Sequence, residues 1–401
     1  MKAVIVGGGV AGPATALALR HVGIDAVLLE RRAGRDPAEG SYFTLAPNGL
    51  DALDLLGGLD LAREVGFPTA TNVMYGATGR LLGEIRLGVP LADGTVALTA
   101  KRSLLAARFV DQAESRGVDV RRGAEVVAVA SHDGSATVTL ADGERLAADL
   151  VVGADGVRSR VRPAIDPEAP AGRYVGLTNF GGITRETPLA ASLRREAWHF
   201  VFGARAFFGA HPTPAGDVVW FVNVPEPEIS RERRAAMSAE DWQRRLLDLV
   251  ADDAGPAAEL VAGGTLELAG DNTYDLPHVP HWTRDRLVLV GDAAHAPSPS
   301  SGQGASMALE DAVVLATSLR DHASGPADLP TALHAYEQAR RARVERIVKA
   351  GARSSDAKTH GPVGRRFRET AMSLVFRYLV TDRSTAWMTG SRLSWDGQRA
   401  A

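Results

Sequence analysis

A short apolar run, followed at once by closely spaced glycines, opens the chain. Residues 2–6 are apolar and largely β-branched, which is typical of a strand buried in a parallel sheet. Gly7, Gly9 and Gly12 follow with the spacing G-x-G-x-x-G, and residues 14–21 have the Ala- and Leu-rich composition of a helix. In such a unit the glycines permit a tight turn, the approach of a pyrophosphate, and close packing of the helix on the strand. The opening therefore predicts a dinucleotide-binding domain built on a parallel sheet.

The next apolar run, residues 26–29, ends at Glu30. A carboxylate at this point can accept hydrogen bonds from the adenosine ribose hydroxyls and would repel a 2′-phosphate. Strand, helix, second strand and terminal Glu together argue against a glycine-rich turn without a ligand. We count Ala11, inside the glycine motif, and Arg31, after the strand, among the cofactor-binding candidates.

Two further segments suit the same ligand. Residues 152–156 read V-G-A-D-G, and residues 290–295 read V-G-D-A-A-H after another apolar run. A carboxylate at a strand end, such as Asp292, can accept two hydroxyls, and charged hydrogen bonds contribute roughly 1.5–3 kcal/mol. Residues 299–306, P-S-S-G-Q-G-A-S, then lead into a predicted helix, whose N-terminus would stabilise an anion.

In this order, the three segments resemble the FAD-dependent class A aromatic monooxygenases, the para-hydroxybenzoate hydroxylase-like family, over about residues 1–350. The resemblance implies an α/β fold, in which a Rossmann-like FAD-binding domain of the GR2 type carries an inserted α+β substrate domain and C-terminal helices. It also implies non-covalent FAD and NADPH or NADH as a transient reductant. The predicted cofactor-binding residues are Gly7, Gly9, Ala11, Gly12, Glu30, Arg31, Arg102, Asp155, Gly291, Asp292, Pro299, Gly302, Gln303, Gly304, Ala305 and Ser306.

The resemblance gives several of these residues a role. It implies that Asp292 binds the ribityl chain, that Asp155 contacts the pyrophosphate and the passing nicotinamide, and that Arg102 lies against the flavin side of FAD. The backbone of Gly302 and Gly304 is expected at the flavin edge, and no side chain is assigned as a catalytic base. Ser306 stands where many relatives have Asn, and a serine there can still cap the helix.

For four other polar residues, a structural role or exposure to solvent has to be weighed against a role in the site. Arg162 could bind phosphate or lie on a solvated helix, and Lys101 is expected to be solvated. His295 is expected to pack near the pyrophosphate rather than to transfer a proton. His211 could face the substrate pocket or the solvent.

Aromatic residues are concentrated between residues 167 and 276. The run 198–202 alternates, so a strand would place Trp198, Phe200 and Phe202 on one face. Core packing explains any single aromatic residue, but together they suit a pocket wall above a flavin. The substrate-pocket candidates are Trp198, Phe200, Phe208, His211, Trp220 and Pro297.

The expected FAD-binding domain comprises residues 1–70, 97–166 and 277–350. The substrate domain comprises residues 71–96 and 167–276, and residues 351–401 form a helical tail. Within the first domain, 138–146 reads as a hairpin with Asp-Gly at its turn, part of a three-stranded meander. Residues 330–358 read as a long amphipathic helix, and the tail as one more helix, about 363–379, followed by a loose end.

Composition excludes several classes of function. A formal net charge of −3 gives no electrostatic reason to bind nucleic acid or an anionic membrane. No apolar run approaches the ~20 residues that span a bilayer. The chain has no cysteine, so disulfides, Cys-ligated metals and cysteinyl flavin are excluded and no metal is expected. We expect a cytoplasmic monomer or homodimer, since a lack of cysteine is compatible with a reducing compartment.

The resemblance implies a single-component monooxygenase that uses NAD(P)H and O2. Its C4a-hydroperoxyflavin would transfer oxygen to an aromatic or polyketide-like small molecule, as in secondary metabolism. One alternative is another flavoenzyme on the same scaffold, either an oxidase or dehydrogenase, or a halogenase, whose W-x-W-x-I-P segment is not seen in this sequence. Another alternative is a non-enzymatic FAD-bearing accessory protein.

Overall fold

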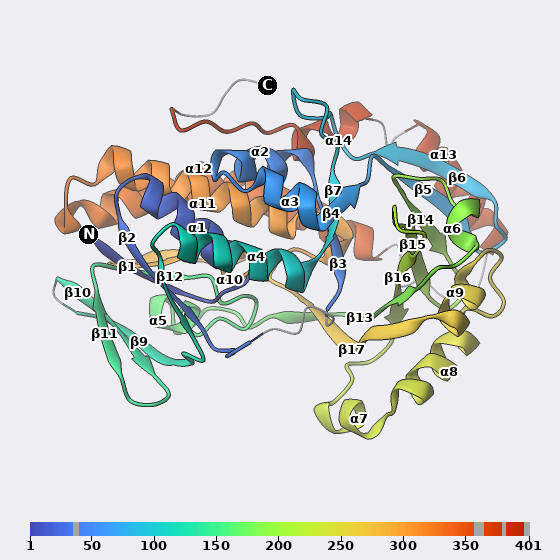
Figure 1. Cartoon of the computed structure of the whole chain (residues 1–401), viewed down its shortest axis with the longest axis horizontal. Coiled ribbons are helices and arrows are strands. Elements are labelled where there is room, and N and C mark those ends of the chain that lie inside the picture. The colour runs from blue at the N-terminus through green and yellow to red at the C-terminus, as the bar shows by residue number, and fades with distance from the viewer. Residues whose placement is uncertain (35–39, 133, 357–364, 379–381, 397–401) are drawn as a thin grey trace.

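The structure is a computed structural model that describes residues 1–34, 40–132, 134–356, 365–378 and 382–396 (Figure 1). Its first layer is a six-stranded sheet with the order β18-β19-β12-β1-β2-β8. All neighbours are parallel except the antiparallel pair β18 and β19. The strands are β1 (Lys2–Val6), β2 (Asp25–Glu30), β8 (Asp119–Arg122), β12 (Leu150–Gly153), β18 (Thr283–Arg284) and β19 (Leu287–Leu289).

Helices and a meander cover this sheet. Helix α1 (Ala11–His21) contacts α4 (Arg102–Ser115) and α11 (Gly304–His322), and α12 (Leu329–Asp356) packs on α11. The antiparallel meander of β9 (Val126–His132), β10 (Ser135–Leu140) and β11 (Arg145–Ala148) contacts β1 and β12. Figure 1 shows α11 and α12 above the sheet and the meander below it. The apolar strands predicted from sequence are therefore buried on both faces.

A second sheet of seven strands has the order β17-β13-β16-β15-β14-β5-β6. Helices α8 (Ala239–Val250) and α9 (Ala257–Gly263) contact β17 and β13, and α8 lies below the sheet in Figure 1. The short helix α6 (Leu189–Ser192) contacts β15, and the short helix α7 (Arg231–Ala236) precedes α8 in the chain. The strands are β5 (Thr71–Gly76), β6 (Leu81–Arg86), β13 (Arg173–Thr184), β14 (Ala197–Phe202), β15 (Phe207–Pro212), β16 (Val218–Pro225) and β17 (Thr265–Asp275).

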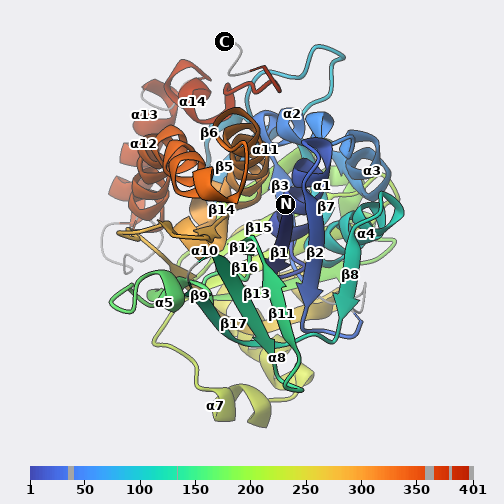
Figure 2. The ribbon, with the colours of Figure 1, turned by 90° about the vertical axis from the view of Figure 1, so that its left-hand side faces the viewer.

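A small sheet with the order β3-β7-β4 stands between the two large ones in Figure 1, and Figure 2 shows β3 and β7 beside α1 and α4 when the molecule is seen from the side of the N-terminal sheet. Its strands are β3 (Tyr42–Leu45), β4 (Gly66–Pro68) and β7 (Leu98–Lys101). Helices α2 (Pro47–Leu55) and α3 (Leu59–Val65) join β3 to β4. The remaining short helices are α5 (Arg162–Ile165), α10 (Asp292–His295), η1 (Pro299–Ser301) and η2 (Pro326–Asp328).

Most predicted elements are present, with differences at their ends. Helix α1 begins at Ala11, three residues before the predicted start, because Gly12 and Pro13 belong to its first turn. The predicted meander is confirmed, and its Asp-Gly turn has Gly143 at φ +90°. The helix expected at 330–358 corresponds to α12, which ends at Asp356; residues 357 and 358 of the prediction lie outside the described residues.

The tail differs from the prediction. Helix α13 (Arg365–Tyr378) corresponds to the predicted helix, although residues 363, 364 and 379 lie outside the described residues. The prediction that no further helix follows was wrong, because the tail contains helix α14 (Asp382–Thr389). The tail is also tied to the seven-stranded sheet: α13 packs on β6, and the Thr78 hydroxyl donates to Glu369 Oε2 over 2.8 Å.

Candidate functional site

The first glycine motif touches the second motif directly. Gly7 has φ +111°, and a Cβ built on it would lie 2.5 Å from the carbonyl oxygen of Ala154. A Cβ on Gly12 would lie 1.8 Å from the oxygen of Gly7. Only glycine fits at these two positions, because any side chain would displace the backbone of the β1–α1 turn or of the 153–156 segment.

Gly9, unlike the crowded Gly7 and Gly12, faces open space, since nothing lies within 4 Å of a Cβ built there. Helix α1 starts beside it without a side-chain cap and without an acidic residue in its first turn. Its N-terminal N–H groups therefore remain able to bind an anion. Glu30 ends β2 nearby, and its carboxylate accepts hydrogen bonds from Gly8 N at 2.8 Å and Arg32 N at 2.9 Å. Arg31 is exposed.

The third motif lies against the first. Gly291 has φ +60°, and a Cβ on it would lie 3.1 Å from the Cβ of both Ala11 and Ala308. The next residue, Asp292, keeps a side chain that is 36% exposed, and its Oδ2 lies 4.0 Å from the Arg102 guanidinium. The structure thus brings together Asp292 and Arg102, two predicted cofactor residues from distant parts of the chain.

The loop before α11 completes this arrangement. A Cβ on Gly304 would lie 3.6 Å from Asp292 Oδ1 and 3.5 Å from Pro297 Cγ, so these three residues adjoin one another. Gly302 has the left-handed φ of +62° and ends η1, which begins at Pro299. Helix α11 begins at Gly304 with no side-chain cap from Gln303 and no acid in its first turn. Ala305 is half-buried in that turn.

Ser306 does not cap the helix as we expected. Its hydroxyl instead accepts a hydrogen bond from Ala46 N at 3.2 Å, and it is fully buried against Gly49. The segment 46–49 therefore holds the first turn of α11. Sequence reasoning missed this segment, although Pro47 at the start of a helix, followed by Asn48 and Gly49, is a local signal.

These residues fit FAD. Helices α1 and α11 have uncapped N-termini in one region, and Gly9 and Gly302 leave space on the backbone side. An acceptor, Asp292, directly follows Gly291, which lies against both helices, and adjoins Gly304. Asp155 adds a carboxylate whose Oδ2 accepts from Arg160 N at 2.6 Å, while its buried Oδ1 has no protein partner. Burial raises the pKa of Asp155. Such unsatisfied polar groups are expected where a polar ligand binds.

Behind the site, a buried network of charges anchors the third motif. Asp311 Oδ2 accepts from Gly291 N at 2.9 Å and lies 2.5 Å from His295 Nε2, and Asp311 Oδ1 accepts from Arg340 at 2.7 Å. Glu310 binds Arg340 at 2.6 Å and also Arg343 and Asn48. Although burial alone would raise the pKa of Asp311, His295 and Arg340 lower it below its usual range. Asp311 therefore stays ionised and holds Gly291 in place.

The expectations for two polar residues, Arg162 and Lys101, are wrong. Arg162 is neither a phosphate ligand nor a surface residue: it is 4% exposed and donates to the carbonyls of Ala293 and Val157. Lys101 is not solvated, since it is 8% exposed and pairs with Glu267 at 2.8 Å. The packing of His295 near the pyrophosphate stays a prediction, and its Nε2 has Asp311 as a partner.

The aromatic candidates divide between the two faces of the seven-stranded sheet. Trp198, Phe200 and His211 lie on the face that packs with Tyr42 and Phe67 of the small sheet. His211 is 1% exposed, so it does not face the solvent.

The strand register places the other two candidates on the opposite face. Phe208 pairs with Val201, the neighbour of Phe200, and Trp220 pairs with Ala210. Both belong to the core under α8 and α9, where the Trp220 indole donates to Thr184 at 3.0 Å. Phe208 and Trp220 therefore do not share a wall with Trp198.

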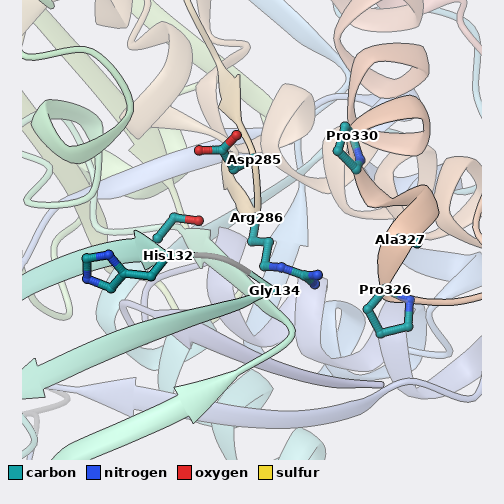
Figure 3. Close-up of a pocket in the computed structure, with 8 residues that line it drawn as sticks. His132, Gly134, Asp285, Arg286, Pro326, Ala327 and Pro330 are labelled. Carbon is teal, nitrogen blue, oxygen red and sulfur yellow. The ribbon is translucent and has the colours of Figure 1, made fainter.

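A surface pocket of about 300 Å³ lies elsewhere (Figure 3). It is formed by the β9–β10 turn, the β18–β19 turn and the start of α12, and it contains no residue of the three motifs. The charged group at its centre, Arg286, donates to the carbonyl of Asp149 at 3.1 Å. We assign this pocket no chemistry. Within the described residues, no group of His, Asp and Glu could hold a metal ion, and no helix could cross a membrane.

Comparison with known proteins agrees with this geometry. Residues 1–351 match the family model described as "FAD binding domain". The chain belongs to this FAD-binding family. The resemblance to class A FAD-dependent monooxygenases is thereby confirmed, as are the α/β fold and FAD as the cofactor.

Among its relatives, the family member 2-heptyl-3-hydroxy-4(1H)-quinolone synthase of Pseudomonas aeruginosa is 35% identical, over 87% of each chain. Zeaxanthin epoxidase of Nicotiana plumbaginifolia is 28% identical over 86% of this chain, which spans about half (53%) of that relative's length. The crystal structure of Klebsiella pneumoniae HpxO with FAD and uric acid superposes with a TM-score of 0.81 at 25% identity, covering 97% of this chain and 96% of that one.

Proposed function

We propose that this protein is a single-component, NAD(P)H-dependent FAD monooxygenase that hydroxylates a small aromatic or polycyclic molecule. The observation that carries the proposal is the convergence of Asp292, Arg102 and Gly304 at the uncapped start of α11, within the family fold. The names of two relatives support the class of substrate, because a quinolone and uric acid are both small ring compounds.

Each part of the proposed cofactor site has a physical role. The N–H groups at the start of α1 would bind the pyrophosphate, and Asp292 would accept the ribityl hydroxyls. The N–H groups at the start of α11 would stabilise negative charge at the flavin edge. Bound FAD supplies the acceptance of a hydride from NAD(P)H and the activation of O2. The rest of the protein orients the substrate and keeps water away from the reacting centre.

We also propose that the chain forms two domains, each built on one of the two large sheets. Residues 1–70, 97–166 and 277–350 would form the FAD-binding domain, and the six-stranded sheet and the meander draw all their strands from these ranges. Residues 71–96 and 167–276 would form the substrate domain, and they supply every strand of the seven-stranded sheet. Residues 351–401 would be a helical tail. The enzyme would work in the cytoplasm as a monomer or homodimer, with a role in secondary metabolism.

The test is oxygen incorporation by the FAD-loaded protein. NADH or NADPH is added with a panel of phenols, quinolones and purines under 18O2, and the products are analysed by mass spectrometry. We expect one compound to accelerate NAD(P)H oxidation and to gain one labelled oxygen atom. Stoichiometric hydrogen peroxide with an oxidised but unlabelled compound would instead identify an oxidase, and a protein that binds FAD without consuming NAD(P)H would be an accessory protein.

A further inference from the structure

Four side chains between the small sheet and the seven-stranded sheet form a continuous chain of hydrogen bonds. His211 Nε2 lies 3.0 Å from the hydroxyl of Thr69, which lies 2.7 Å from the hydroxyl of Thr99. The hydroxyl of Thr99 in turn lies 2.8 Å from that of Thr44. The indole N–H of Trp198 donates to Thr44 at 3.0 Å and to Thr99 at 3.2 Å. His211, Thr69, Thr99 and Thr44 come from β15, the end of β4, β7 and β3, and Trp198 joins them from β14.

The direction of every bond in this chain is fixed at one end. His211 Nδ1 lies 2.8 Å from the carbonyl oxygen of Pro212, which can only accept, so Nδ1 carries the proton. The neutral ring then has an acceptor at Nε2, and the Thr69 hydroxyl must donate to it. The other acceptor near Thr69, the carbonyl of Phe67, is 3.5 Å away, beyond an ordinary O–H···O distance.

The same constraint propagates along the chain. Because the Thr69 proton is used, Thr99 donates to Thr69, and because the Thr99 proton is used, Thr44 donates to Thr99. Each hydroxyl has one proton and two lone pairs. Thr44, at the far end, donates its proton to Thr99 and accepts from Trp198 with one lone pair. Its second lone pair can accept a hydrogen bond from a further partner.

Thr44 is also the most exposed residue of this chain of hydrogen bonds. Thr69 and Thr99 are 0% exposed, His211 1% and Trp198 4%, whereas Thr44 is half-buried. Thr44 lies two residues before Ala46, whose N–H donates to Ser306 in the first turn of α11. The accessible end of the chain is therefore adjacent to the segment that holds the proposed flavin edge.

Burial keeps the His211 ring neutral. The pKa of His211 is lowered to about 4, because burial and, to a smaller extent, the nearby His199 lower it more than the hydrogen bond to Pro212 raises it. Its ring neighbours, Phe67 and Trp198, carry no charge. A base this weak cannot hold a proton taken from a phenol near neutral pH. The chain of hydrogen bonds can orient a substrate but does not deprotonate it.

We propose that Thr44 Oγ1 is a specificity-determining acceptor for a ring O–H or N–H group of the aromatic substrate. His211 is a positioning residue, which acts through Thr69 and Thr99 to keep Thr44 an acceptor. The inference rests on the proposed function, because it concerns the substrate of that site. It predicts that rings with a hydrogen-bond donor bind in preference to rings of the same shape without one.

The first test measures binding to the FAD-loaded protein through the change in flavin absorbance. The probes are two pairs of similar shape: 1-naphthol with 1-fluoronaphthalene, and 4-quinolone with chromone, in which a ring oxygen replaces the N–H. We expect the donor of each pair to bind about tenfold more tightly, as for one hydrogen bond with a buried partner. Thr44→Val should reduce this preference to within about twofold, and Thr69→Val should reduce it as well, because a free Thr99 hydroxyl can then reorient. Thr137→Val, in the meander, is the matched control and should leave the preference unchanged.

The second test does not depend on the substrate. The 15N chemical shifts of the His211 ring should show a proton on Nδ1 and none on Nε2 at pH 7, with the assignment made by comparison with His211→Gln. A proton on Nε2, equal binding within both pairs, an undiminished preference in Thr44→Val, or no binding of any probe by FAD-loaded protein would each overturn the proposal. Failure of the proposed function looks different, because the rings would still bind with the predicted preference while no labelled oxygen is incorporated, whether or not the flavin is reduced.

Discussion

At the scale of single residues, two glycines of the first motif are required for different reasons. Gly12 is crowded by the backbone of Gly7, whereas Gly9 faces open space. The first is a requirement of the fold, and the second keeps room for a ligand.

This difference predicts opposite results for one substitution. Gly12→Ala should lower the thermal stability of the apoprotein, because its Cβ would lie 1.8 Å from Gly7 O. Gly9→Ala should leave that stability nearly unchanged but weaken FAD binding at least tenfold. Thermal unfolding of apoprotein and titration with FAD separate the two effects. A stable Gly12→Ala, or a Gly9→Ala with normal affinity, would contradict this assignment.

Asp292 gives a second residue-scale prediction. Asp292→Ala should weaken FAD binding by 1.5–3 kcal/mol, roughly ten- to a hundredfold, because an ionic acceptor for ribityl hydroxyls is lost. The fold should persist, since the carboxylate is partly exposed and its contact with Arg102 is 4.0 Å long. Asp248→Ala, which removes an exposed carboxylate on α8, is the control. Unchanged affinity in Asp292→Ala with a normal circular dichroism spectrum would remove Asp292 from the site.

His211 links stability to pH. Its pKa is about 4 in the folded protein, below the usual 6.5, so the unfolded chain binds more protons between these values. The free energy of unfolding should therefore fall as the pH drops from 6.5 to 4, by about 3 kcal/mol from this residue. His211→Gln should lack this component, whereas the contribution of His199, whose pKa is also lowered by burial, remains in both proteins. Urea unfolding of both proteins across this range measures the difference, and parallel pH profiles would contradict the shift.

At the scale of elements, the pairing of α11 with α12 depends on buried charges. Arg340 is 1% exposed and compensates Glu310 and Asp311, which are 0% exposed. Arg340→Met should destabilise the protein by about 3–5 kcal/mol, because it leaves buried carboxylates short of a partner. Arg320→Met on α11 removes an exposed pair and should cost less than about 1 kcal/mol. Urea midpoints compare the two, and equal losses would show that the buried network contributes little.

The elements also show what could be predicted from sequence. The strand–glycine–helix unit, the meander and the start of α11 are local patterns, so they were predicted close to their observed positions. The partner of Lys101 was not, because Glu267 lies in a different sheet and only the tertiary fold brings the two together. Alternation within β14 predicted that Trp198 and Phe200 share a face. It could not place Phe208 or Trp220, whose faces depend on the register between strands.

The same limit applies to the candidate site. Asp292, Arg102 and Gly304 were predicted from motifs and do adjoin one another. The hydroxyls of Thr44, Thr69 and Thr99 were missed, because isolated threonines in strands carry no motif. Neither alternative for Arg162 named its partners, which are backbone carbonyls of Ala293 and Val157, because no local pattern shows a buried arginine bound to backbone.

At the scale of the whole molecule, the proposed cofactor site joins the first twelve residues to segments near residues 155 and 292–306. FAD should therefore stabilise the entire fold rather than one element. At a free concentration a hundredfold above its Kd, FAD should add about 2.7 kcal/mol to the free energy of unfolding. FMN, which lacks the AMP portion of FAD and therefore the complete pyrophosphate that the α1 motif is proposed to bind, should add much less. Thermal unfolding of apoprotein with each flavin tests this, and equal stabilisation by FMN would contradict binding at α1.

The order of strands in the six-stranded sheet has a consequence for the newly made chain. Strand β1 pairs with β12, and β12 pairs with β19, which ends at Leu289. At about 5–20 residues per second, a ribosome finishes the phosphate-binding turn roughly 15–60 s before it makes Asp292. During that interval the turn has no third motif beside it, and the β12 edge of the sheet lacks its neighbour. FAD therefore binds only late in the synthesis of each new molecule, and a nascent chain halted before β19 should carry no yellow FAD.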